Sequence, residues 1–292
     1  MPDDTGFRDG WVSSQDGLRL YYRDYPGSGT PVLCLPGVPR NSKDFARLAE
    51  RLSPRHRVIC PDFRSRGRSQ YDPDWSHYIP PTYADDVCHL LASLGVHRVH
   101  VIGTSLGGIV AMVMAVAMPG VLASVVLNDI GPEIGPKIGQ GTNGGALSAI
   151  MDYMKDDTPQ ADWDAAAGHV RGAYLPNFPK GTPDDWMEIA RHTYREKADG
   201  TLVHDWDYAI VKQFAVALSC DFDLWPLFMA LSRVPVLCVR GALSSILSQS
   251  TLDAMKTAMP AMADVTAADC GHPARLSEPN VLEAIDAHLA RA

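Results

Sequence analysis

Two residue types far apart in the chain could together perform nucleophilic catalysis. Ser105 is the centre of Gly103-Thr104-Ser105-Leu106-Gly107, between an apolar run at 99–102 and a helical pattern at 106–118. Between a strand and a helix, this spacing lifts the serine hydroxyl out of a tight turn, and the glycines allow the two elements to approach closely. The helix N-terminus then favours negative charge developing at the site. Ser105 is therefore the candidate nucleophile.

A serine hydroxyl becomes a strong nucleophile only when a base removes its proton and a third group orients that base. His272, in Gly271-His272-Pro273, follows a predicted strand near 263–268 and precedes a predicted helix at 279–292. We expect its loop to leave the sheet at the same edge as Ser105, and it follows the serine in the order usual for this turn. His272 is the candidate base.

The elements that must hold these residues alternate between short apolar runs and helical patterns. Strands are predicted at 31–35, 57–60, 99–102, 124–127 and 235–239, after a hairpin around the turn 15–17. Short buried runs separated by helices are typical of a parallel sheet covered on both faces. We therefore predict an α/β fold with a mostly parallel central sheet and helices on both faces.

The alternation stops between about 131 and 231, where helical patterns and scattered aromatic residues replace the strands. The clearest helices are predicted at 162–170, 183–197 and 206–218. The sequence thus predicts a core formed by 1–131 and 229–292, interrupted by a helical cap at 132–228. Such an insertion would lie above the carboxyl ends of the strands, where ligands of open α/β sheets bind.

Composition narrows the function classes. The chain has 292 residues, 46% of them hydrophobic and 21% charged, which is enough to bury a full-sized core. Its net charge of −8 disfavours binding to nucleic acid or to anionic membranes. No cofactor or metal is expected, because neither a ligand cluster nor a phosphate loop occurs. The expected partner is a small-molecule substrate, and a homodimer stays open.

Location is predicted from the cysteines and the N-terminus. The six cysteines show no paired spacing, and three fall within apolar runs, at Cys34, Cys60 and Cys238. Buried thiols in a reduced compartment are the expectation. The start of the chain has neither a basic segment nor an apolar one, so no secretory signal is expected. A cytoplasmic protein is therefore predicted.

Four motifs together resemble the α/β-hydrolase family, in its cap-domain branch of esterases and carbon–carbon hydrolases. They are LPGVPRN near residue 37, PDFRSRGRS at 61–69, GTSLGG at 103–108 and GHP at 271–273. The resemblance implies an oxyanion hole built from the backbone N–H groups of Val38 and Leu106. The family often has His-Gly where this chain has Pro36-Gly37, so a bracing side chain is lost but the backbone donor is kept.

The position of the triad's acidic residue departs from the family pattern. The usual carboxylate follows the strand at 235–239, where this chain has Ser245. Some relatives use a second position after the preceding strand, and there this chain has Asp129, the preferred acid. Glu133 is the reserve, and Asp269 is disfavoured because it should point along its own strand.

Several residues are candidates for substrate binding. Arg40 and Asn41 directly follow the oxyanion loop, and the cap supplies aromatic residues, among them Trp163, Tyr174 and Trp206. Arg64, Arg66 and Arg68 are instead expected to brace their loop. A mainly apolar pocket is predicted, as is usual for small-molecule sites.

The predicted function is hydrolysis of a small, mainly apolar ester or related carbonyl compound through a Ser-His-acid triad and an acyl-enzyme. Two alternatives stay open. One is carbon–carbon bond hydrolysis or lactone opening in aromatic catabolism, for which Arg40 is the candidate carboxylate partner. The other is a catalytically weak binding protein, suggested by the serine at position 245.

Overall fold

A single eight-stranded sheet forms the centre of the protein in a computed structural model, which describes residues 6–135, 145–220 and 222–291. The strand order is β1-β2-β4-β3-β5-β6-β9-β10, and only the pairs β1–β2 and β2–β4 are antiparallel. The strands are β1 (Arg8–Ser13), β2 (Arg19–Tyr25), β3 (Gly29–Leu35), β4 (His56–Pro61), β5 (Val99–Thr104), β6 (Leu122–Asn128), β9 (Val236–Gly241) and β10 (Ala263–Ala267). The predicted α/β fold with a mostly parallel sheet is confirmed.

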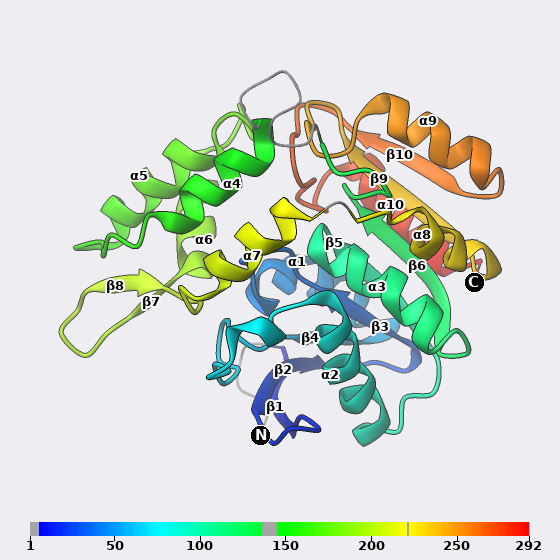
Figure 1. Cartoon of the computed structure of the whole chain (residues 1–292), viewed down its shortest axis with the longest axis horizontal. Helices are drawn as coiled ribbons and strands as arrows, with labels where there is room; N and C mark the ends of the chain where they lie inside the picture. Colours follow the sequence, from blue (N-terminus) through cyan, green and yellow to red (C-terminus); the bar gives the residue numbers. More distant parts are fainter. Residues whose placement is uncertain (1–5, 136–144, 221, 292) are drawn as a thin grey trace.

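Successive residues of the central strands point into two separate cores. Leu33 and Val101 belong to the core under α2 (Pro80–Ser93), α3 (Leu106–Ala117), α8 (Trp225–Ala230) and α9 (Gln249–Ala258). Val32 and Ile102 belong to the opposite core, under α1 (Ala46–Leu52) and α10 (Pro279–Leu289). Because side chains alternate along a strand, a run that is apolar throughout needs helices on both faces. Figure 1 shows this layered arrangement.

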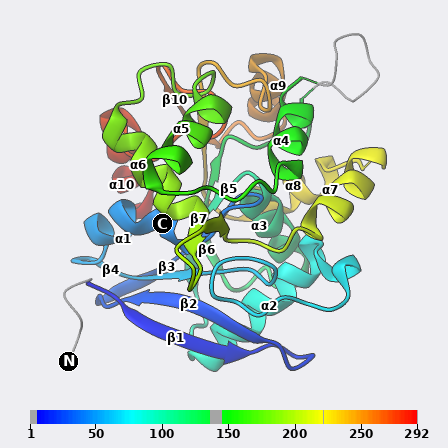
Figure 2. The ribbon, with the colours of Figure 1, turned by 90° about the vertical axis from the view of Figure 1, so that its left-hand side faces the viewer.

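The segment between β6 and β9 contributes most of the remaining elements. These are α4 (Gly145–Lys155), α5 (Trp163–Tyr174), α6 (Pro183–Thr193), β7 (Tyr194–Glu196), β8 (Leu202–His204) and α7 (Ile210–Ser219). They gather on one side of the sheet in Figure 1 and face the viewer in Figure 2. We call residues 132–228 the cap, keeping the predicted boundaries, although the last four of these residues begin α8, which packs against α3 of the core.

One predicted helix of the cap is shorter than the sequence pattern indicates. The pattern extends from 183 to 197, but α6 ends at Thr193 and Tyr194–Glu196 form strand β7, paired with β8. The side chain of Tyr194 explains the change, because it is buried and its hydroxyl lies 3.1 Å from Nε2 of His204 on β8. This tertiary contact overrides the local helical preference of the charged residues that follow.

Two further sequence-based expectations concern membrane-spanning helices and the burial of the cysteines. In the described part of the chain, no helix combines the length and the apolar character needed to cross a membrane. Cys34, Cys60 and Cys238 are buried within β3, β4 and β9, as their apolar neighbours indicated.

Candidate active site

Ser105 occupies a strained turn between β5 and α3. Its backbone has φ 51° and ψ −114°, outside the regions that non-glycine residues usually adopt. The turn is held to the neighbouring strand by the Ser105 N–H, which donates to the carbonyl oxygen of Asn128 at 3.0 Å. The flanking glycines are required for space: a Cβ on Gly103 would lie 2.5 Å from the carbonyl oxygen of Gly107. Close packing of strand and helix thus fixes the serine at the start of α3.

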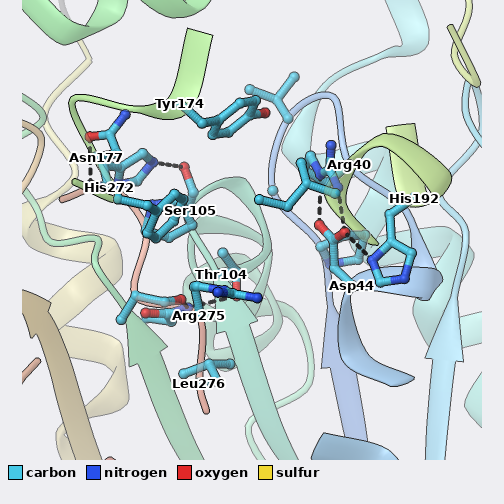
Figure 3. A pocket seen from close by; sticks show the side chains of 18 of the residues that line it. Arg40, Asp44, Thr104, Ser105, Tyr174, Asn177, His192, His272, Arg275 and Leu276 are labelled. Carbon is cyan, nitrogen blue, oxygen red and sulfur yellow. Dashed lines mark hydrogen bonds and ion pairs between the residues drawn. The ribbon is translucent and has the colours of Figure 1, made fainter. Parts of the chain in front are cut away.

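The predicted base is hydrogen-bonded to this serine, and the predicted acid is hydrogen-bonded to the base. Nε2 of His272 lies 3.0 Å from Oγ of Ser105, and Nδ1 lies 2.7 Å from Oδ2 of Asp129. Figure 3 shows the imidazole turned toward the serine. An ionised carboxylate can only accept, so Nδ1 carries the proton and Nε2 is left free to accept the proton of the serine. His272 is buried and Asp129 is fully buried.

Asp129 is aimed at the histidine by two further donors. It follows β6 directly and has a positive φ of 55°. The N–H of Gly241 donates to Oδ1 at 2.9 Å, and the hydroxyl of Ser244 donates to Oδ2 at 2.5 Å. Both donors come from the end of β9 and the turn after it. The turn where the family usually carries its acid therefore supports the carboxylate of the neighbouring strand.

Ser245 and the other acidic candidates lie elsewhere. The side chain of Ser245 is exposed at the edge of the cavity, and its neighbour Ser244 makes the contact to Asp129. Glu133 accepts hydrogen bonds from Nε1 of Trp225 and from the hydroxyl of Thr251, both at 3.1 Å. Asp269 is paired with Lys180 at 2.6 Å on the surface. Among the described carboxylates, only Asp129 hydrogen-bonds to the His272 ring.

The loop after β3 lies directly beside Ser105. A Cβ on Gly37 would lie 3.4 Å from Cβ of Ser105, so the main chain passes at van der Waals distance. The carbonyl oxygen of Gly37 accepts a hydrogen bond from Nη1 of the fully buried Arg66 at 3.1 Å. Val38 follows in this loop, and Leu106 is the first residue of α3. The backbone N–H groups of Val38 and Leu106 have no backbone acceptor among the described residues.

The three arginines of the motif at 61–69 brace the structure, as the sequence predicts. Arg66 holds the loop at Gly37, and Arg64 pairs with Asp16, Asp72 and Asp86. Arg68 pairs with Asp9 on β1 at 2.6 Å. Asp16 and Asp72 also lie close to His77, the one set of three potential metal ligands among the described residues. Because Nη1 of Arg64 contacts both of these aspartates at 2.7 Å, the guanidinium already supplies their positive partner.

A cavity of about 470 Å³ opens over Ser105 and His272, between the sheet and the cap. Of the predicted substrate-binding residues, Arg40 and Tyr174 line it (Figure 3). Val38, predicted for the oxyanion hole, lines it as well. Trp163, Trp206 and Asn41 are not among the described residues that line it. The ring of Trp206 stacks on His204 at 4.0 Å, and Trp163 lies under the guanidinium of Arg191. Trp163 therefore packs within the cap, and Trp206 packs where the cap meets the core, since its backbone pairs with that of Arg66.

Asn41 and Arg40 connect the core to the cap. Asn41 accepts from the N–H of Lys43 and donates from Nδ2 to the carbonyl oxygen of His192 at 2.9 Å. Arg40 binds both oxygens of Asp44, at 2.7 and 2.6 Å, and its Nη1 donates to the hydroxyl of Thr193 at 2.5 Å. Figure 3 shows the Arg40–Asp44 pair at the end of the cavity away from Ser105.

The charges in this part of the cavity are internally balanced. Burial would raise the pKa of Asp44, but the Arg40 guanidinium outweighs it and holds that pKa below its ordinary value. Two further arginines of the lining, Arg47 and Arg275, contact Glu188 at 2.7 and 3.3 Å. The cavity lining therefore combines paired ions with aromatic and aliphatic side chains.

Three residues of the site were not found from the sequence. Ser244 supports Asp129, and Asn128 donates from Nδ2 to Ala274 just after the histidine, at 2.9 Å. Asn177 of the cap accepts from the N–H of His272. The position of Asn128 next to Asp129 at a strand end was a usable signal. Nothing in the local sequence marks Asn177, because its partner lies 95 residues away.

A nucleophile turn between a central strand and its helix, with a histidine from a late loop and a carboxylate from a strand end, defines the class of α/β hydrolases. The model of the alpha/beta hydrolase fold family matches residues 30–279. The chain belongs to this family.

Individual relatives extend over nearly the whole chain. A 3-hydroxybutyrate-oligomer hydrolase of Cupriavidus necator is 28% identical over 272 residues, covering 89% of each chain. Among solved structures, an alpha/beta hydrolase from Novosphingobium aromaticivorans is 37% identical with a TM-score of 0.91, covering 99% of this chain and 100% of that one. E-2-(acetamidomethylene)succinate hydrolase is 27% identical with a TM-score of 0.82, covering 97% and 99%.

Proposed function

We propose that the protein is a serine hydrolase that cleaves ester-type bonds through an acyl-enzyme. The observation that carries the proposal is the unbroken hydrogen-bonded series from Asp129 through His272 to Ser105. The buried carboxylate holds the imidazole with Nε2 toward the serine hydroxyl and stabilises the imidazolium that forms when the proton is transferred.

The first half of the reaction forms the acyl-enzyme. Ser105 Oγ attacks the substrate carbonyl while His272 takes its proton, and the carbonyl oxygen becomes an oxyanion. The N–H groups of Val38 and Leu106 would stabilise this charge, and each donor of this kind is typically worth about 3–4 kcal/mol. The imidazolium then protonates the leaving group, which departs.

The second half repeats these steps with water. His272 removes a proton from the water, which attacks the acyl carbon, and a second oxyanion forms in the same place. Its collapse releases the acid and returns the proton to Ser105. The base is therefore used twice in each turnover, and every step needs the same imidazole orientation.

The cavity supports a small acyl compound as substrate. Ile150, Tyr153, Tyr174 and Phe178 supply apolar wall, and the arginines of the lining are paired with carboxylates. Esters of short hydroxy acids combine apolar carbon chains with polar ends, and one relative is named as acting on 3-hydroxybutyrate oligomers. Esters of this size are the proposed substrate class.

The test is hydrolysis of p-nitrophenyl butyrate and of a 3-hydroxybutyrate dimer by the wild type and Ser105→Ala. We expect kcat to fall at least about 10³-fold in the variant, because the covalent route is lost. Ser250→Ala, which removes an exposed hydroxyl outside the cavity, is the matched control. Equal turnover by Ser105→Ala would refute the proposal.

A second candidate is cleavage of a substrate that carries a free carboxylate, including carbon–carbon and lactone substrates. Arg40 favours it, because its guanidinium lines the cavity opposite the serine. The relative that acts on a substituted succinate agrees with this class. Arg40→Met should raise KM for acidic esters and leave KM for neutral esters within about 2-fold. Equal effects on both would reject the acidic class.

The third reading, a binding protein without turnover, was suggested by the serine at position 245. The hydrogen bond between His272 and the carboxylate of Asp129 supports turnover over that reading. Labelling by a fluorophosphonate separates the two, since an activated Ser105 reacts and an inert one does not.

A further inference from the structure

The main chain of the loop that carries His272 is hydrogen-bonded to the core on both sides of the histidine. The N–H of Leu243 donates to the carbonyl oxygen of Cys270 at 2.8 Å, and Nδ2 of Asn128 donates to the carbonyl oxygen of Ala274 at 2.9 Å. These bonds lie on either side of the histidine. Neither of them holds the main-chain N–H of His272 itself.

That N–H is held by the cap. Oδ1 of Asn177 accepts it at 3.0 Å, and the carbonyl oxygen of the same asparagine accepts the N–H of Gly271 at 2.6 Å. Asn177 lies in the connection between α5 and α6, and Figure 3 shows it beside His272. One cap residue thus receives two consecutive N–H groups of the loop that carries the base.

The approach of the two segments depends on the glycine before the histidine. A Cβ on Gly271 would lie 2.8 Å from Cα of Asn177, so any side chain there would push the cap segment away. The contact is therefore a close main-chain junction between cap and core.

The same cap segment forms part of the cavity wall. Asn177 lines the cavity together with Tyr174 and Phe178, which precede and follow it in the chain. Its own N–H is fixed by the carbonyl oxygen of Tyr174 at 2.9 Å, so the asparagine moves with the end of α5. A substrate that presses on this wall acts on the residue that holds the His272 main chain.

We propose that Asn177 is a positioning residue through which the cap sets the placement of the catalytic histidine. The proposal rests on the proposed hydrolase function of Ser105 and His272. It implies that the position of the cap against the core controls the rate of proton transfer and not only access to the cavity. A displacement of about 1 Å in a catalytic group can reduce a rate about 10²-fold, so a modest shift at this junction is sufficient.

Two substitutions at position 177 separate positioning from mere packing. Asn177→Leu keeps most of the side-chain volume but removes the acceptor, and we expect kcat for p-nitrophenyl butyrate to fall about 10-fold with KM within 2-fold. Asn177→Asp keeps an acceptor at the same place and should recover kcat to within about 3-fold of wild type above pH 8. Its added negative charge should also move the acid limb of the pH–rate profile to higher pH.

Lys180→Ala is the matched control. It removes the exposed Lys180–Asp269 ion pair at 2.6 Å from the same junction without touching His272. We expect kcat and the pH–rate profile to be unchanged. Thermal unfolding of every variant is measured in parallel, and rates are compared at temperatures where each is fully folded.

Two results would overturn the proposal. One is a wild-type kcat in folded Asn177→Leu, and the other is an equal loss in Asn177→Asp with no shift of the acid limb. Failure of the hydrolase function itself would look different, because wild type and Ser105→Ala would then have equal rates and Ser105 would not react with a fluorophosphonate. A wild type that is labelled and active therefore isolates the role of Asn177.

Discussion

Replacing Asp129 by asparagine keeps the shape of the side chain and removes its charge. The carboxylate accepts from the N–H of Gly241, from the hydroxyl of Ser244 and from Nδ1 of His272, and it is fully buried. An amide offers one acceptor and one donor group in place of two acceptors. The N–H of Gly241 can only donate, so it selects the amide oxygen and leaves the amide NH₂ toward Ser244 and His272.

The consequence follows from the imidazole tautomer. An NH₂ group facing Nδ1 needs that nitrogen to accept, which places the proton on Nε2 and leaves Ser105 without a base. A wrong tautomer of this kind typically lowers kcat about 10⁴-fold. With about 1.4 kcal/mol for each tenfold change, the loss corresponds to about 5–6 kcal/mol of transition-state stabilisation.

The assay is the steady-state rate on p-nitrophenyl butyrate, with thermal unfolding to show that the variant folds. Asp269→Asn is the matched control, because this exposed carboxylate lies three residues from His272 and pairs only with Lys180 among the described residues. Glu133→Gln examines the reserve acid. Both should keep kcat within about 3-fold of wild type.

The reasoning would be refuted by Asp129→Asn that is folded and within tenfold of wild type. A large loss of kcat in Glu133→Gln would then assign the role of the acid to Glu133. A loss of less than tenfold in all three variants would mean that no carboxylate among them orients the base.

Three further predictions concern the surroundings of the site. Ser244→Ala removes one donor to Asp129 and should lower kcat about 10-fold, far less than loss of the charge, in the same assay. Gly103→Ala places a Cβ against the carbonyl oxygen of Gly107, and urea unfolding should show a loss of about 1–3 kcal/mol in stability; an unchanged midpoint would contradict the close packing. The free energy of unfolding should fall as the pH is lowered from about 6.5 toward 4. The reason is that burial lowers the pKa of three histidines to about 4: His100, His204 and His288. Between about pH 6.5 and pH 4 the unfolded chain therefore takes up protons that the folded protein does not.

The central sheet and the nucleophile turn were predictable because their signals are local. Short apolar runs alternating with helical patterns specify buried parallel strands whatever the rest of the chain does. The Gly-x-Ser-x-Gly motif needs only the strand before it and the helix after it to adopt its geometry. The family model covers the same elements.

Which residue orients His272 could not be decided from the local sequence alone. Asp129 at a strand end was the preferred candidate and Glu133, four residues later, was the reserve, while the family's usual acid position held Ser245. The choice depends on which side chain lies opposite Nδ1 of His272, 143 residues further along the chain. Parallel strands bring the ends of β6 and β9 together, and the turn after β9 adds Ser244 as a donor.

The cap was the least predictable part. Its aromatic residues suggested a pocket lining, yet Trp163 packs within the cap, Trp206 packs against the core, and Tyr174 lines the cavity. An amphipathic pattern indicates that one face of a helix is buried, but it does not indicate which element packs against that face. Strand β7 likewise exists because β8 pairs with it.

The sequence by itself determined the sheet, the strained serine and the order of serine and histidine, because each depends on residues that are neighbours in the chain or on a periodic pattern. Only the tertiary structure decided that Asp129 orients the histidine and that Asn177 of the cap holds its main chain. Those contacts join segments about 95 to 143 residues apart, and their existence depends on how the layers pack rather than on any local preference.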